Sequence, residues 1–123
     1  MKIIHTPNAP AAIGPYSQAV VSNGTLYVSG QIPVDPATGA FAGDTIAQQA
    51  EQSCKNVGAI LAAAGADFGK VVKTSCFLAD MADFAVFNEV YARYFVSKPA
   101  RACVAVKTLP KGALCEIEAV AEV

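Results

Sequence analysis

One arginine enters an otherwise apolar strand pattern near the end of the chain, and it restricts how this segment can fold. Residues 100–106 read Ala-Arg-Ala-Cys-Val-Ala-Val, in which Arg101 is the single charge. A buried guanidinium without a counter-charge is strongly disfavoured, so we expect an anion beside it. Glu116 or Glu118 in the next apolar segment could supply a structural ion pair, which residue type alone favours. The alternative is a small carboxylate ligand held by two parallel hydrogen bonds.

The chain carries few charges for its size. Of its 123 residues, 15% are charged and 54% are hydrophobic, and the formal net charge is −1. We expect one domain over residues 1–123, large enough to bury a core of its own. So few polar residues cannot cover the whole surface of a small domain, so apolar surface should remain exposed. This predicts a homo-oligomer. The lack of a Lys/Arg run argues against a nucleic-acid partner.

The sequence gives no sign of a membrane segment or of a metal site. No apolar run approaches the ~20 residues that span a bilayer, and the first residues lack a signal peptide's apolar segment, so we expect a cytoplasmic protein without a membrane partner. Four cysteines form no C-x-x-C pair and are joined by one histidine, which fits neither a zinc site nor a disulfide framework. Cys54, Cys76 and Cys115 are predicted core residues, whereas Cys103 is set apart by its place two residues after Arg101.

Local signals predict the first half of the fold. Asn23-Gly24 between residues 17–21 and 25–29 is a strong hairpin signal, because both turn positions tolerate positive φ. Thr45 and Gln48 match a capping box that starts a long helix, and Gly65 supplies its left-handed end.

The second half adds strands and a shorter helix. Residues 71–78 are rich in strand formers, and Asp80 or Asp83 can cap a helix that runs to about Phe95. Alternation places Arg101, Cys103 and Ala105 on one face of their strand. The last strand, residues 114–120, then turns its glutamates to one face and Ile117 and Ala119 toward the helices.

Three polar sites have both a structural and a functional interpretation. Asn88 lies one helical turn from Phe84 and Tyr91, so it is either a satisfied structural amide or a ligand contact. Tyr16 follows an irregular lead-in and is either a core residue or part of a pocket. Ser29-Gly30 offers a hydroxyl and close backbone approach, although serine before glycine is also ordinary turn chemistry.

The order of elements predicts an α+β domain. Two helices should pack on one face of a mixed sheet, and the semi-polar opposite face should associate between subunits. The sequence has no Walker loop, G-x-G-x-x-G, H-E-x-x-H or G-x-S-x-G motif. Enzymatic chemistry would therefore depend on Arg, Glu, Cys, Tyr, Ser and water.

Five segments resemble the RidA (YjgF-type) enamine/imine deaminases. They are residues 11–18 (AAIGPYSQ), 29–33 (SGQIP), 87–91 (FNEVY), 99–104 (PARACV) and 116–119 (EIEA). The resemblance implies a chorismate-mutase-like fold, a homotrimer with active sites between subunits, and no metal or organic cofactor. It also implies hydrolysis of 2-iminobutanoate and 2-iminopropanoate, tautomers of enamines released by pyridoxal-phosphate dehydratases, to 2-oxo acids and ammonia.

The resemblance also implies roles for single residues. Arg101 resembles the arginine that binds the substrate carboxylate, and Glu116 the residue that activates the attacking water. Cys103 and Ser29-Gly30 resemble positions that line the pocket and bind the substrate, and Cys103 is counted with Arg101 and Glu116 among the catalytic positions.

Two further positions resemble residues at the border of the cleft, namely Tyr16 and Asn88. The chain departs from the common pattern at Ala102, at Ala105 and in the short segment 96–98, which leaves substrate preference open. The alternatives are a non-catalytic trimeric regulator that binds 2-oxo acids, an endoribonuclease or translation inhibitor, and a purely structural oligomer.

Overall fold

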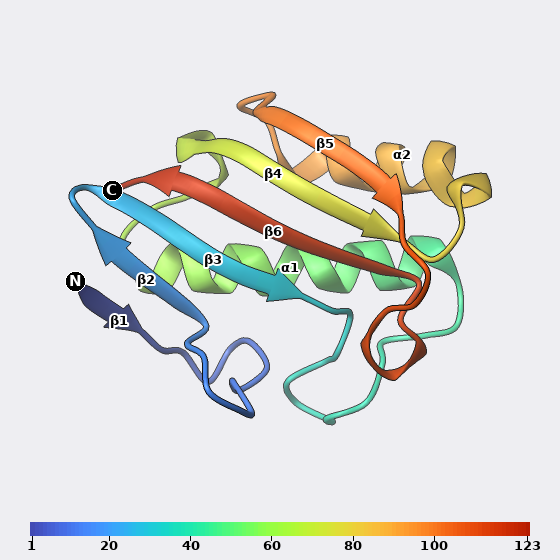
Figure 1. Cartoon of the computed structure of the whole chain (residues 1–123), viewed down its shortest axis with the longest axis horizontal. Helices are drawn as coiled ribbons and strands as arrows, with labels where there is room; N and C mark the ends of the chain where they lie inside the picture. The colour runs from blue at the N-terminus through green and yellow to red at the C-terminus, as the bar shows by residue number, and fades with distance from the viewer.

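Two helices cover one face of a six-stranded sheet in the computed structural model, which describes residues 1–123 (Figure 1). The helices are α1 (Ile46–Ala63) and α2 (Phe84–Tyr94). The strands are β1 (Lys2–Ile4), β2 (Ala19–Ser22), β3 (Thr25–Gln31), β4 (Val71–Leu78), β5 (Ala100–Ala105) and β6 (Cys115–Glu122). Short 3₁₀ turns lie at Phe68–Lys70, Met81–Asp83 and Pro110–Gly112.

The sheet is mixed, in the order β1-β2-β3-β6-β4-β5. Only β4 and β5 run parallel, and the other neighbours are antiparallel. α2 lies in the crossover from β4 to β5, as a parallel connection requires. The predicted α+β class, with a mixed sheet and two helices on one face, is confirmed.

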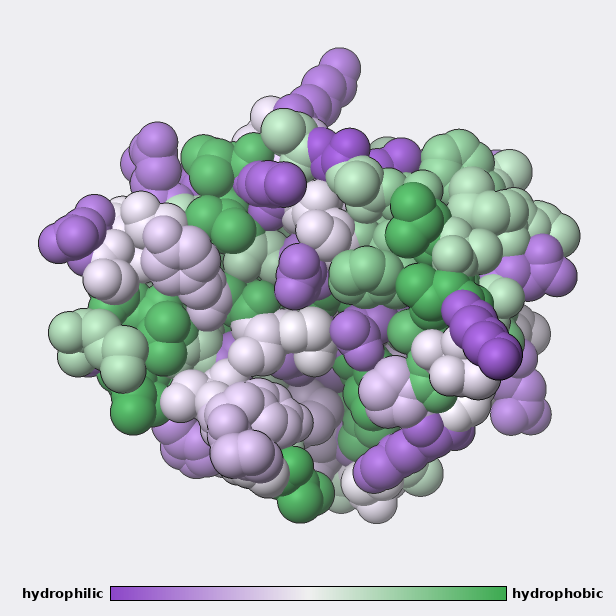
Figure 2. All heavy atoms as spheres, in the orientation of Figure 1, coloured by the Kyte–Doolittle hydropathy of each residue, from purple (hydrophilic) through white to green (hydrophobic).

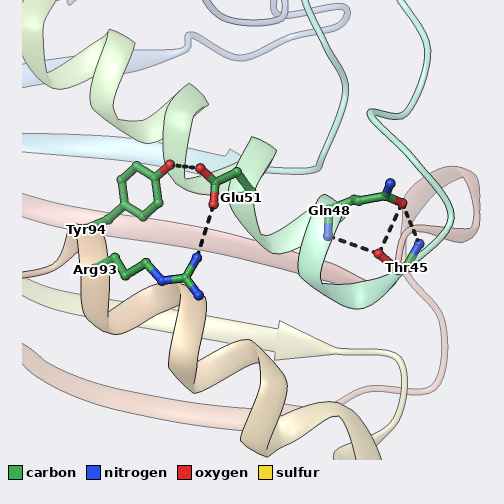
Figure 3. A network of polar contacts seen from close by, with 5 residues as sticks. All are labelled: Thr45, Gln48, Glu51, Arg93 and Tyr94. Atoms are coloured by element: carbon green, nitrogen blue, oxygen red, sulfur yellow. Dashed lines mark hydrogen bonds and ion pairs between the residues drawn. The ribbon is translucent and has the colours of Figure 1, made fainter.

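The turn and cap signals of the sequence are confirmed with one refinement. Asn23 and Gly24 have φ values of 51° and 74°, as the tight turn between β2 and β3 requires. Thr45 Oγ1 accepts from the Gln48 N–H at 3.2 Å, and Gln48 Oε1 accepts from the Thr45 N–H at 3.2 Å (Figure 3). Asp80 caps the 3₁₀ turn that precedes α2, whereas Asp83 makes no capping bond.

The two helices are joined by polar side chains as well as by the core. The Tyr94 hydroxyl on α2 donates to Glu51 on α1, and Arg93 Nη1 lies 3.9 Å from Glu51 Oε2 (Figure 3). This is the one ion pair in the chain, and Arg93 is well exposed, so it contributes little to stability.

The core lies between the helices and the sheet. Cys54, Cys76 and Cys115 are fully buried there, as predicted. Along β6 the burial alternates, with Ile117 and Ala119 in the core and Glu118 exposed on the opposite face. No helix of the chain is both long and apolar enough to cross a bilayer.

The opposite face of the sheet, which we call the open face, is covered by no helix. Figure 2 shows this face, on which hydrophobic and hydrophilic side chains are interleaved over the strands. Tyr27 and Val104, both on this face by register, are 49% and 48% exposed. Large side chains of this kind, left half exposed on a sheet, suit an intersubunit contact.

Candidate functional site

Arg101 is held against one side of α2. Its guanidinium carbon lies 4.8 Å from the centre of the Tyr91 ring and 5.6 Å from that of Phe84. Its Nη1 donates to Asn88 Oδ1 at 2.8 Å. These three partners stand at positions 84, 88 and 91, one stripe of the helix, as the spacing predicted. The guanidinium is thus oriented by a cation–π contact and an amide, and most of its N–H donors are free.

The Tyr91 side chain is itself held in place by the sheet. Its hydroxyl lies 2.6 Å from the Thr74 hydroxyl on β4, and both residues are buried. Burial raises the pKa of Tyr91 to about 12, although the hydrogen bond with Thr74 opposes the shift. The phenol therefore stays neutral and serves as a rigid support for Arg101.

The prediction of an ion pair between Arg101 and Glu116 or Glu118 is wrong within the chain. Arg101 is aligned with Thr74 in the sheet, and Thr74 is aligned with Ala119, so all three face the helices. The glutamates alternate with Ala119 along β6 and therefore face the open side. No carboxylate lies within 4.0 Å of the guanidinium. The only ion pair of the chain joins Arg93 and Glu51 on the helices.

A cavity of about 560 Å³ opens beside Arg101. Asn88 and Tyr91 line it from α2, and Lys98 and Pro99 line it from the segment that leads into β5. The charged residues in its wall are two cations and no acid. The cavity is therefore suited to an anion.

Glu116 lies on the open face, close to the backbone of Gly30. A Cβ placed on Gly30 would stand 2.5 Å from Glu116 Oε2, so a larger residue there would require the Glu116 carboxylate to move. The register between β3 and β6 shifts between Val28 and Gln31, so a β-bulge at this point brings the two together. Close backbone approach, predicted for Gly30, is confirmed.

Burial raises the pKa of Glu116, and the neighbouring Glu118 carboxylate adds to the shift. The carboxyl is half-buried, so it holds its proton more readily than an exposed glutamate. A carboxylate with a raised pKa is suited to accept a proton from water and to return it.

Ser29 precedes Gly30 on β3 and is linked to the segment that contains Tyr16. The Ser29 hydroxyl donates to the Ser17 carbonyl at 2.5 Å, and its N–H donates to the Gln18 carbonyl at 2.9 Å. Ser29 thus ties β3 to the lead-in that carries Tyr16. Tyr16 is 54% exposed, so its interpretation as a core residue is wrong.

Cys103 lies on the Arg101 side of the sheet. It is aligned with Cys76 on β4 and is half-buried. Burial raises the pKa of the Cys103 thiol, and the Arg101 charge opposes the shift. A protonated thiol is a poor nucleophile. No cluster of three His, Cys, Asp or Glu side chains that could hold a metal ion is present.

The predicted site residues therefore form two groups on opposite faces of the sheet. The Arg101 group contains Asn88 and Cys103, and the Glu116 group contains Ser29 and Gly30. The sequence did not predict that Phe84 and Tyr91 support Arg101, or that Lys98 lines the same cavity. The spacing of Phe84 and Tyr91 around Asn88 indicated their proximity, but nothing in it showed that an arginine from β5 would lie over them. The only sequence signal for Lys98 was its place in segment 96–98, which departs from the common pattern of the family.

Comparison with known proteins places the chain among related sequences over nearly its whole length. The family model for endoribonuclease L-PSP matches residues 6–123. A human protein named 2-iminobutanoate/2-iminopropanoate deaminase is 54% identical over 121 residues, covering 98% of this chain and 88% of that protein. A protein of Lactococcus lactis named putative regulator AldR is 53% identical, covering 100% and 98%.

Solved structures give the same result. The crystal structure of E. coli TdcF with bound serine is 46% identical and superposes with a TM-score of 0.95, covering 100% of this chain and 99% of that one. Identity near one half, over full length and with the same fold, is far beyond a likeness of fold alone. The chain therefore belongs to the endoribonuclease L-PSP family, which is the YjgF/RidA family.

Proposed function

We propose that this protein hydrolyses 2-imino acids, with 2-iminobutanoate and 2-iminopropanoate as substrates, to 2-oxo acids and ammonia. Water adds across the C=N bond, and the carbinolamine then breaks its C–N bond to release ammonia. The observation that carries this proposal is the Arg101 cavity, an anion site with no acid of its own. The human relative named for this activity supports it.

Arg101 is the proposed carboxylate-binding group. Asn88 occupies one N–H of Nη1, which leaves several donors for a bidentate pair with the substrate carboxylate. Tyr91 and Phe84 hold the guanidinium in place, so little side-chain entropy remains to be lost on binding. This pair would fix the position of the neighbouring imine carbon.

Glu116 is the proposed acid–base group. Its carboxylate would accept a proton from the attacking water, and the resulting acid would protonate the departing nitrogen. The raised pKa favours the second step, because the proton is held until the C–N bond breaks. The proposed reaction needs no metal or organic cofactor, and its substrates arise from pyridoxal-phosphate-dependent dehydratases.

The two groups would come from different copies of the chain. Arg101 and Glu116 face opposite sides of one sheet, so a single chain cannot present both to one small molecule. β5 is an edge strand, and the open face leaves Tyr27 and Val104 half exposed, so we propose that a homotrimer covers this face. In that assembly the remaining residues of the shared site would be Tyr16, Ser29, Gly30, Asn88 and Cys103.

The first test is imine hydrolysis with a matched pair of arginine variants. A dehydratase generates the imine in place, and 2-oxo acid formation is followed against a trapping amine. Arg101→Ala should lower kcat/KM by about 100-fold or more, because a charge-assisted bidentate pair is lost. Arg93→Ala removes an exposed arginine from α2 and should leave the rate unchanged. Equal rates for wild type and Arg101→Ala would contradict the proposal.

The second test mixes two inactive variants. Arg101→Ala and Glu116→Gln chains are unfolded together and refolded at equal amounts. If each site takes one residue from each of two copies, about one quarter of the sites regain both residues by random assembly. If both residues act within one chain, no activity returns.

The second candidate function is a metabolite-binding regulator. The Lactococcus lactis relative named putative regulator AldR favours it, and the Arg101 cavity would serve equally well for binding alone. Tight binding of 2-oxobutanoate without faster imine hydrolysis would decide for this function. The family is named for endoribonuclease activity, but the charge of this chain does not support RNA binding. It has nine Lys and Arg residues against ten Asp and Glu residues.

A further inference from the structure

The cavity beside Arg101 contains a second cation that the proposed reaction does not use. Lys98 lines the same cavity of about 560 Å³, three residues before Arg101 in the chain. The other lining residues are neutral, and neither cation has a carboxylate within 4.0 Å. Two unpaired cations facing one small cavity repel each other, so a ligand with two negative charges is favoured over a ligand with one.

The backbone of Lys98 is held in a conformation that few side chains adopt. Its φ is 51°, in the left-handed region that glycine and asparagine enter more readily. The Lys98 N–H donates to the Phe95 carbonyl at 3.1 Å, and the Ser97 hydroxyl donates to the Val71 carbonyl at 2.7 Å. These bonds fix the short segment before β5. The segment therefore holds Lys98 at the wall of the cavity.

The short chain separation of the two cations lets both reach one small dianion. Three residues of extended chain separate their Cα atoms by at most about 10–11 Å. Both side chains are long and both line the cavity, so their charged ends can meet one molecule whose carboxylates are a few ångströms apart. The Arg101 fork matches a planar carboxylate, whereas the Lys98 ammonium is a mobile point charge that can follow a flexible one.

We propose that Lys98 is a specificity residue that makes this site accept imines of dicarboxylic amino acids, such as iminosuccinate and 2-iminoglutarate. Arg101 binds the carboxylate next to the imine carbon, and Lys98 binds the distal carboxylate. The imine hydrolysis in this inference rests on the proposed function. The preference for a dicarboxylate rests on the cavity alone.

The test compares a monoacid with a diacid in matched lysine variants. Lys98→Asn removes the charge and keeps a residue that tolerates the left-handed backbone, and Lys98→Arg restores the charge. Lys111→Asn is the control, because Lys111 has a φ of 56° and lies outside this cavity. The substrates are 2-iminobutanoate and iminosuccinate, generated in place by a dehydratase and by an amino-acid oxidase.

Lys98→Asn should lower kcat/KM for iminosuccinate relative to 2-iminobutanoate by about 3- to 10-fold, the size of one partly exposed charged contact. Lys98→Arg should recover most of that ratio, and Lys111→Asn should leave it unchanged. An unchanged ratio in Lys98→Asn would overturn the proposal.

A binding measurement separates this proposal from the deaminase activity. Affinities for 2-oxobutanoate and 2-oxoglutarate are measured by calorimetry in the same variants. A preference for the diacid that Lys98→Asn removes supports the inference, even if no imine is hydrolysed. Equal affinities for both acids in the wild-type protein would overturn the inference and leave the deaminase proposal intact.

Discussion

Arg101 and Glu116 differ in how far a single chain prepares them for chemistry. Arg101 is oriented by Tyr91, Phe84 and Asn88, and its cavity exists in one chain. Glu116 is half-buried beside the Gly30 backbone and Glu118, and it lies on the sheet face that no helix covers. The proposed carboxylate-binding group is therefore already oriented within one chain, whereas the proposed acid–base group would need a second copy to complete its surroundings. If the proposed roles hold, binding would depend on the single chain and bond cleavage on its assembly.

The sharpest way to separate the two groups is to remove the proposed acid–base group alone. Glu116→Gln should lower kcat by about 10²–10⁴-fold, the usual contribution of general acid–base catalysis. Affinity for 2-oxobutanoate should stay near the wild-type value, because Arg101 binds the carboxylate. Kinetics and calorimetry on the same preparation check this. A parallel loss of affinity would mean that Glu116 helps to hold the ligand.

The next largest effect should come from the backbone beside Glu116. Gly30→Ala places a Cβ 2.5 Å from Oε2, so the carboxylate must move. We expect about a 10- to 100-fold loss of kcat, since small displacements of a catalytic group are costly.

The matched control for Gly30→Ala is Gly58→Ala on α1, whose Cβ would stand 2.8 Å from the Phe68 ring, on the side of the sheet opposite to Glu116. It should lower the free energy of unfolding by about 1–3 kcal/mol and leave kcat unchanged. If both variants lose activity equally, general instability explains the result.

A smaller effect should follow from loosening the support under Arg101. Thr74→Val keeps the shape of the side chain but leaves the buried Tyr91 hydroxyl without its partner. The free energy of unfolding should fall by about 1–3 kcal/mol, the cost of an unpaired buried polar group. KM should rise more than kcat falls, because the ring positions the binding group. Chemical denaturation and kinetics check this, with Thr25→Val on β3 as the control.

The smallest effect concerns pH. Burial raises the pKa of Glu116 in the folded chain, so ionisation of this carboxyl works against folding. Protonated Glu116 imposes no such cost, so the cost is absent well below the ordinary value of 4.5 and develops as pH rises through the higher folded pKa. Glu116→Gln should therefore be slightly more stable than wild type near pH 7, by less than about 1 kcal/mol because the group is half-exposed, and equal below pH about 4. Melting temperatures across this pH range test it.

Much of the fold could be predicted because its signals are local. The Asn23-Gly24 turn, the Thr45–Gln48 capping box and the alternation along β6 each depend on neighbours a few residues away. The same is true of Asn88, whose place beside Tyr91 follows from the helical repeat alone. These features hold in the structure because nothing distant overrides them.

The site was predicted less completely, because its geometry depends on long-range register. The residues by themselves determined that an arginine and glutamates stand in successive strands. The expectation that burial would force an anion onto the arginine is not met within the chain, because Arg101 is exposed. Only the tertiary structure decided that β4 lies between β5 and β6 and aligns Arg101 with Thr74 and Ala119. Since a shift of one residue turns every side chain of a strand to the other face, this alignment alone puts Arg101 and Glu116 on opposite sides of the sheet.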